Sequence, residues 1–220
     1  MPDEVFAIFA ARKQHDVPVI VGFNADEGAQ FADRALPATS EAYVQNIRRQ
    51  FGEFADEYLK LYPAGSREVM LDSAARRFRD ESHAWKMLTW ARMMTPMKSP
   101  VRLYYFTQVP PGSQFGAHHA AEIIYVFDNL QRRQAAWTAE DRNVAQTMSA
   151  YWVNFAGTGD PNGAGPNETK LPNWPRYEPK TDRHIEFGKS IAVKEGLHQQ
   201  AFEFWDRYFA AQRARRKAQP

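Results

Sequence analysis

Two apolar runs, rich in β-branched and aromatic residues, limit the folds open to this chain more than any other feature. They are VPVIVGF (residues 17–23) and VRLYYFTQV (residues 101–109). Apolar runs of this length are typical of strands buried on both faces, as in a parallel sheet covered by helices. A polar turn, NADEG, directly follows the first run. The chain is therefore predicted to form an α/β layer with polar groups at the carboxyl ends of its strands.

The segments around these runs predict helices and one more strand. Between the runs, residues 40–95 show apolar residues at spacings of three and four, which indicates a helical excursion. HIEFG (184–188) is a short strand candidate, and a terminal helix with a basic end follows from residue 197. Three strand candidates are few for a doubly wound sheet, so we expect the chain to be part of a larger domain.

The helix that starts near Thr138 has the clearest boundaries. Thr138 and Asp141 have the spacing of a capping box, and Gly157 and Gly159 stand where the helix should end. The residues predicted to form its apolar face are Val144, Met148, Trp152 and Phe155.

Composition excludes several functions. The chain of 220 residues has no cysteine, which rules out disulfides, thiolate metal ligands and a cysteine nucleophile without fixing the compartment. A formal net charge of +2 gives no general attraction to nucleic acid. The N-terminus lacks the pattern of a signal peptide, and no apolar run is long enough for a membrane span. We therefore expect neither a nucleic-acid partner nor a membrane span.

The segment GAHHAAEIIYVF (116–127) raises the question of a metal site. His119 and Glu122 are three residues apart and would share one face of a helical turn. The helical zinc motifs HExxH and HxxEH are both incomplete, since HxxEH needs a histidine where Ile123 stands. We expect no metal site, and a metal-dependent hydrolase using His118, His119 and Glu122 stays as an alternative.

A role in acid–base catalysis is the stronger interpretation of His119. His119 follows one predicted buried strand, and Glu27 follows another, so a sheet could bring their loops together. A carboxylate on one imidazole nitrogen fixes the tautomer and leaves the other nitrogen to act as a base. The chain has no G-x-S-x-G segment to supply a serine nucleophile. Two of the three members of a hydrolase triad are therefore candidates here.

Four segments in order make a family resemblance specific. They are VPVIVGFNADEG, GAHHAAEIIYVFDNL, YWVNFAGTGDPNG and LPNWPRYEP. The chain resembles the C-terminal part of the type-B carboxylesterases, which include para-nitrobenzyl-type esterases and cholinesterases. The resemblance implies an α/β-hydrolase fold with mostly parallel strands and inserted helices. It also implies that residues 1–220 are the C-terminal segment of one such domain, whose N-terminal half carries the serine and the oxyanion hole.

The resemblance assigns roles to individual residues. It makes Glu27 the triad acid, with Asp26 as its competitor, and His119 the general base. His118 becomes a neighbour without a catalytic role, and Glu122 a carboxylate that supports the triad from behind. The implied partner is a carboxylic ester, with no cofactor, and the chain alone is expected to be inactive. A catalytically inactive, cholinesterase-like protein used for binding or adhesion is the other alternative.

Overall fold

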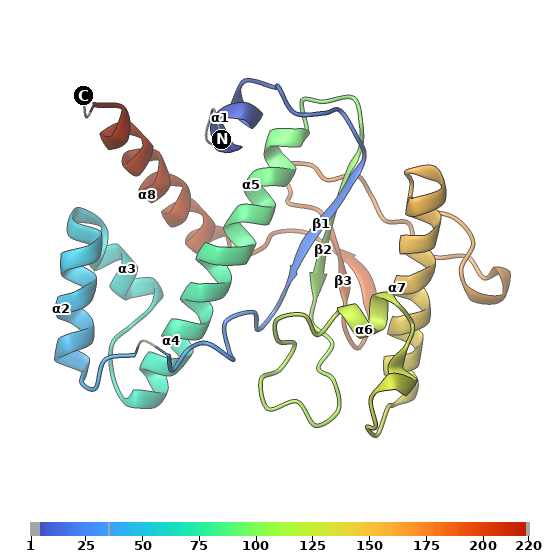
Figure 1. Cartoon of the computed structure of the whole chain (residues 1–220), viewed down its shortest axis with the longest axis horizontal. Coiled ribbons are helices and arrows are strands. Elements are labelled where there is room, and N and C mark those ends of the chain that lie inside the picture. The colour runs from blue at the N-terminus through green and yellow to red at the C-terminus, as the bar shows by residue number, and fades with distance from the viewer. Residues whose placement is uncertain (1–4, 35, 219–220) are drawn as a thin grey trace. The chain divides into compact units, whose positions relative to one another are not determined.

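The computed structural model describes residues 5–34 and 36–218 (Figure 1). The chain divides into two compact units. Unit 1 comprises the residues up to Ala25 together with Met87–Gly196, and unit 2 comprises Asp26–Lys86 together with the residues from Leu197 onward. That residues 1–220 belong to a single α/β-hydrolase domain stays a prediction.

Unit 1 contains a four-stranded sheet. Its strands, in the order β1-β2-β3-β4, are Val19–Asn24, Val101–Phe106, His184–Phe187 and Ile191–Lys194. The pairs β1/β2 and β2/β3 are parallel, and β3/β4 is antiparallel. The last residues of β1 and β2, Asn24 and Phe106, are register partners. The two longer strands therefore end at the same edge of the sheet, as predicted for an α/β layer.

The strands are shorter than the apolar runs that predicted them, and one strand was not predicted. β2 ends at Phe106 rather than at Val109, before the Pro110-Pro111 pair that cannot donate ladder hydrogen bonds. β4 follows β3 after only Gly188, Lys189 and Ser190, as a hairpin. Its four residues are half-buried or exposed, so they lack the apolar run on which the other predictions relied.

Helices cover the sheet of unit 1. In Figure 1 the sheet lies between α7 (Ala139–Thr158) on one side and residues 87–94 of α5 (Trp85–Met94) on the other. The unit also contains the short helices α1 (Val5–Ala10), α6 (Ile123–Val126), η3 (Leu130–Arg132) and η4 (Pro166–Glu168). The capping box of α7 is present, and the helix ends at Gly159 with a left-handed φ of 77°.

The apolar face of α7 is turned slightly from the predicted one. Val144 and Met148 are buried as predicted, whereas Trp152 and Phe155 are only half-buried. Tyr151 is fully buried instead, and its ring contacts those of Trp174 and Phe187.

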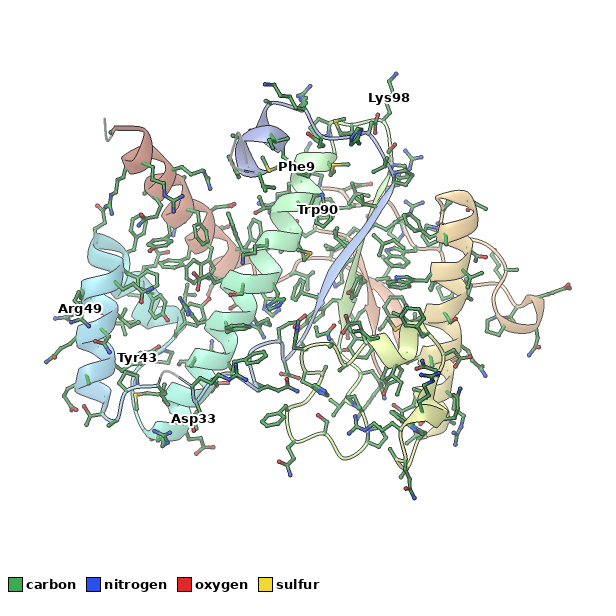
Figure 2. All side chains as sticks on the ribbon, in the orientation of Figure 1. Phe9, Asp33, Tyr43, Arg49, Trp90 and Lys98 are labelled. Atoms are coloured by element: carbon green, nitrogen blue, oxygen red, sulfur yellow. The ribbon has the colours of Figure 1, made fainter. Side chains whose placement is uncertain are left out.

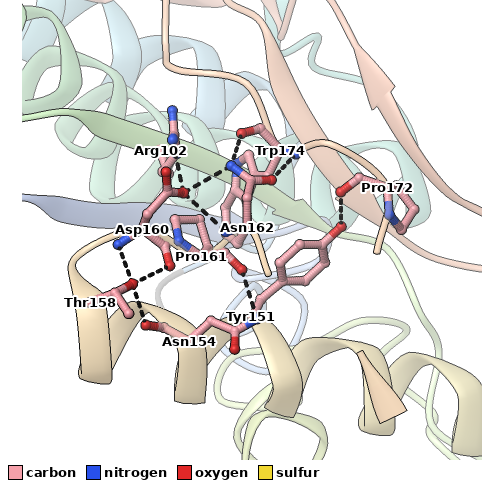
Figure 3. Close-up of polar contacts among 9 residues, drawn as sticks. All are labelled: Arg102, Tyr151, Asn154, Thr158, Asp160, Pro161, Asn162, Pro172 and Trp174. Atoms are coloured by element: carbon pink, nitrogen blue, oxygen red, sulfur yellow. Dashed lines mark hydrogen bonds and ion pairs between the residues drawn. The ribbon is translucent and has the colours of Figure 1, made fainter. Parts of the chain in front are cut away.

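The TGDPNG and LPNWP segments hold each other in place in unit 1 (Figure 3). The Asn162 amide accepts from the Trp174 backbone N–H at 2.7 Å and donates to the Trp174 carbonyl at 3.0 Å. The buried Trp174 indole donates to the carbonyl of Leu103 in β2 at 3.0 Å. Asp160 accepts from the buried Arg102 guanidinium at 3.1 Å. Both motifs therefore stabilise the fold, because they hold two loops against strand β2.

Asn162→Ala is expected to lower the free energy of unfolding by about 2 kcal/mol, because both backbone groups of Trp174 lose their partner. Urea unfolding followed by tryptophan fluorescence measures the change. Asn143→Ala, at an exposed position of α7, is the control and should not lower the midpoint. Equal midpoints for the two variants would refute this role of Asn162.

Unit 2 is helical. Its helices are α2 (Ser40–Phe51), η1 (Gly52–Phe54), α3 (Ala55–Leu61), α4 (Arg67–Arg79), the π-helical segment η2 (Asp80–Ala84), the first residues of α5, and α8 (Gln199–Ala218). The predicted excursion is thus helical from Ser40 to Met94, with a break between Leu61 and Arg67 that contains Pro63 and Gly65. Within the described ranges 5–34 and 36–218, no helix is both long and apolar enough to cross a bilayer.

An aromatic core joins α8 to the other helices of unit 2. The Trp205 indole donates to the Tyr62 hydroxyl at 3.0 Å, and this hydroxyl donates to Asp80 at 2.9 Å. The rings of Phe51 and Tyr58 pack beside them, with centroids 4.3 Å apart. Tyr43, labelled in Figure 2, is buried and donates to the carbonyl of Tyr62. Such buried aromatic side chains contribute large apolar areas to stability, so these three tyrosines, Phe51 and Trp205 form part of the core of unit 2.

Candidate active-site residues after the central strands

Asn24 ties the histidine loop to the end of β1 in unit 1. Its fully buried side-chain amide donates to the carbonyl of His118 at 2.8 Å and to the Glu122 carboxylate at 2.5 Å. Glu122 precedes α6 directly, so one amide holds both the loop and the start of the helix. Hydrogen bonds to a charged acceptor are the stronger kind. We call this group of Asn24, Glu122 and the His118 carbonyl the asparagine clamp.

The two adjacent histidines have different surroundings. The His118 imidazole is half-buried, and its Nδ1 lies 3.2 Å from both Ser113 Oγ and the Gly116 carbonyl of the same loop. His119 is exposed, and the next residue, Ala120, has a left-handed φ of 66°. A non-glycine residue with this φ is uncommon and costs energy, which the asparagine clamp around it offsets. The backbone is thus fixed where it presents His119.

Glu27 lies in the turn after β1 and belongs to unit 2, whereas His119 belongs to unit 1. Glu27 is buried, at 5% exposure, while its neighbour Asp26 is half-buried. Within unit 2, Glu27 Oε2 lies 3.7 Å from Nε2 of His83, a residue of the π-helical segment η2. Segments of π-helix occur frequently at functional sites. Within unit 2, the buried Glu27 carboxylate therefore has the His83 imidazole as a neighbour.

Gly28 explains why the turn that carries Glu27 has its sequence. A Cβ added at this position would lie 2.0 Å from the backbone oxygen of Ala75 in α4, which is far inside van der Waals contact. The turn can pack against α4 only because residue 28 has no side chain.

Gly28→Ala is therefore expected to push the turn away from α4 and lower the free energy of unfolding by about 2 kcal/mol. Thermal unfolding of the variant measures this loss. Gly157→Ala is the matched control, because a Cβ there meets no atom within 4 Å and the position is helical. A Gly28→Ala variant as stable as Gly157→Ala would show that the close approach to α4 is not required.

Two supporting residues were not found from the sequence. The clamp role of Asn24 depends on a partner 98 positions away along the chain, and no local pattern indicates that pairing. His83 stands in a helical segment where its type gives no signal, and only the fold of unit 2 places it beside Glu27. Of the three residues considered for a metal site, His118 and Glu122 both have polar protein partners.

Comparisons with known proteins point to one family. Residues 1–205 match the model of the carboxylesterase family. Fumonisin B1 esterase from Sphingopyxis macrogoltabida is 34% identical over 202 residues, which are 88% of this chain and 36% of that protein. Carboxylesterase 5A from Felis catus is 28% identical over 228 residues, covering 93% of this chain and 40% of the relative.

Solved structures agree at the level of the fold. A PNB esterase superposes with a TM-score of 0.73 at 23% sequence identity, covering 93% of this chain and 41% of the esterase. A thermophilic PNB esterase gives a TM-score of 0.73 at 22% identity. The fold is that of the α/β-hydrolases, as the sequence motifs predicted. This chain spans about two fifths of the length of the proteins it matches. Because the family model matches residues 1–205 of the 220, the chain belongs to the carboxylesterase family.

Proposed function

We propose that this chain supplies the acid and the base of a carboxylic ester hydrolase that uses a serine nucleophile. Glu27 is the acid and His119 the general base. The serine and the oxyanion hole belong to a part of the enzyme outside these 220 residues. The relatives named as esterases support ester hydrolysis as the reaction class.

The proposed reaction is a double displacement. His119 takes the serine proton as the serine oxygen attacks the ester carbonyl, and Glu27 stabilises the imidazolium that forms. His119 then returns this proton to the leaving alcohol, which gives the acyl-enzyme. In the second half His119 removes a proton from water, the hydroxide attacks the acyl group, and the proton returns to serine. The scheme includes no metal and no cofactor.

One observation carries the assignment of the base. The asparagine clamp holds the His118 carbonyl and Glu122, so the three residues between them, of which His119 is the first, are presented by a fixed backbone at the carboxyl edge of the parallel strands. Ligand sites of open α/β sheets lie at this edge. Glu122, bonded to Asn24, is proposed to position this loop without taking part in proton transfer.

Glu27→Gln in a full-length enzyme that contains this segment tests the proposed acid. We expect kcat to fall by about ten-thousandfold, because an amide cannot stabilise the imidazolium. Hydrolysis of para-nitrophenyl butyrate measures kcat, and circular dichroism verifies folding. Asp26→Asn is the matched control, with an expected change below about threefold. A larger loss in Asp26→Asn than in Glu27→Gln would transfer the acid role to Asp26.

The isolated chain separates the proposal from its alternatives. Without a nucleophile it should hydrolyse para-nitrophenyl butyrate no faster than an equal concentration of free imidazole. Turnover by the chain alone, with stoichiometric zinc, iron or manganese in metal analysis, would favour the metal-dependent hydrolase. A full-length protein that folds but has no esterase activity would favour the inactive binding or adhesion relative.

A further inference from the structure

A surface pocket lies wholly within unit 2. Its volume is about 680 Å³, within the usual range of small-molecule sites, which is about 300 to 1,000 Å³. Residues from the loop after the Glu27 turn, from α2, from α3 and from α4 line it. They are Phe31, Ala32, Arg34, Leu36, Pro37, Tyr43, Asn46, Ile47, Arg49, Gln50, Tyr58, Ala74, Arg77 and Phe78. Neither the proposed acid, Glu27, nor the proposed base, His119, is a lining residue.

The lining is positively charged. It includes Arg34, Arg49 and Arg77, and none of the described lining residues is an aspartate or a glutamate. Neither Arg34 nor Arg49 forms an ion pair with any residue in the described part of the chain. Arg77 pairs with Glu81, which does not line the pocket, so the positive charge that favours an anion comes mainly from Arg34 and Arg49.

Two of the arginines are already oriented. The Arg34 guanidinium lies over the Phe31 ring, 4.6 Å from its centroid, and Arg49 donates to the Asn46 side-chain oxygen at 2.7 Å. Figure 2 labels Arg49 and Tyr43, both on α2. Stacking on an aromatic ring holds a guanidinium plane without using its N–H donors. Each of the two groups therefore keeps donors for a ligand.

Arg77 adds an unsatisfied donor. Its NH2 group pairs with Glu81 at 2.6 Å, whereas its Nε is buried and has no hydrogen-bond partner among residues 5–34 and 36–218. A buried donor without a partner is energetically unfavourable, so the Arg77 guanidinium is not fully satisfied by Glu81.

The rest of the lining is apolar. Phe31 and Phe78 pack with ring centroids 5.1 Å apart, and Leu36 and Ile47 line the same pocket. An inorganic anion would satisfy the arginines and leave this apolar surface in water. A neutral apolar molecule would leave the arginines without a counter-charge.

We infer that this pocket binds an amphiphilic carboxylic acid, with its carboxylate at the arginines and its apolar body against Phe31, Leu36 and Ile47. Arginine binds carboxylates with two parallel hydrogen bonds, and this geometry fixes the end of the ligand that stays polar. The binding site is independent of ester hydrolysis and can be tested without a nucleophile.

Isothermal titration of the 220-residue protein with decanoate, below its micellar concentration, is the first experiment. We expect one saturable site and at least about tenfold weaker binding of decanamide, which has the same chain length and no charge. Equal affinities for the two molecules, or no saturable binding of decanoate, would overturn the inference.

Arg48 and Arg49 are neighbours on α2, and only Arg49 lines the pocket, so the two provide a matched comparison. Arg49→Gln should weaken decanoate binding about fivefold, and so should Arg34→Gln in the loop before α2. Arg48→Gln makes the same charge change on the same helix, but Arg48 pairs with Asp56 and does not line the pocket. The affinity of the Arg48→Gln variant for decanoate should therefore stay within about twofold of the unchanged protein. All three side chains are exposed, and circular dichroism verifies that the variants fold. If Arg48→Gln weakens binding as much as Arg49→Gln, the effect is general charge and the pocket is not the site.

Discussion

Replacing His119 by alanine in a full-length carboxylesterase that contains this segment is expected to lower kcat about a millionfold, since base and nucleophile act as one unit. The physical reason is that His119 handles the proton in all four transfers of the proposed double displacement. Burst and steady-state hydrolysis of para-nitrophenyl butyrate measure both halves of the reaction. The KM should change far less than kcat, because the imidazole acts mainly in the transition state.

His118→Ala is the control that separates the two adjacent histidines. Among the residues that the structure describes, the hydrogen bonds of the His118 imidazole go to Ser113 and Gly116 of its own loop, so its loss should reduce kcat by no more than about tenfold. Comparable losses in the two variants would mean that the loop as a whole, and not one imidazole, is required. A near-normal kcat in His119→Ala would remove His119 from the mechanism.

The largest expected effect on stability is that of Asp141→Ala, at about 4 kcal/mol. Asp141 is 1% exposed. It accepts from Gln108 at 2.8 Å, from the Tyr125 hydroxyl at 2.7 Å, and from the N–H and hydroxyl of Thr138 at 2.9 Å each. Alanine leaves the Gln108 and Tyr125 donors without a partner in the core of unit 1 and removes the cap on the exposed Thr138. Urea denaturation measures the loss, and Glu140→Gln, at the exposed neighbouring position, should cause a much smaller one.

The same carboxylate should make stability depend on pH. Burial raises the pKa of Asp141, but hydrogen bonds from Thr138, Tyr125 and Gln108 outweigh it and hold the pKa below its ordinary value of 3.8. A lowered folded-state pKa adds stability that is present above pH 3.8 and is lost as pH falls through the folded-state value. Unfolding free energies measured from pH 6 to about pH 2 should fall less steeply in Asp141→Asn than in the unchanged protein. Parallel curves would contradict this linkage.

The fold could be predicted where the signal is local. β1 corresponds to a continuous apolar run and β2 to an apolar run interrupted by Arg102, and such runs are visible without any knowledge of partners. The start of α7 was predictable because Thr138 and Asp141 satisfy each other within one turn. β4 was missed because an edge strand of four half-buried or exposed residues has no periodicity of its own, and only its pairing with β3 defines it.

The candidate site was predictable only in part, for the same physical reason. Glu27 and His119 follow apolar strands, so position and residue type together pointed to them. The asparagine clamp needs Asn24 and Glu122 to meet across two strands, which sequence spacing does not encode. The approach of His83 to Glu27 depends on a π-helical segment, which shifts the side-chain positions that follow it relative to a regular helix. The unit 2 pocket likewise could not be predicted from local sequence, because its lining combines residues from a loop and three helices.

The central claim is that His119 of this segment activates a serine held elsewhere in a full carboxylesterase. Labelling with a fluorophosphonate, followed by intact-mass analysis, tests it most directly, because the reagent reacts with a serine that a nearby base activates. We predict one label per full-length chain, no label in His119→Asn, normal labelling in His118→Asn, and none on the isolated 220 residues. Full labelling of His119→Asn, or labelling of the isolated chain, would contradict the claim.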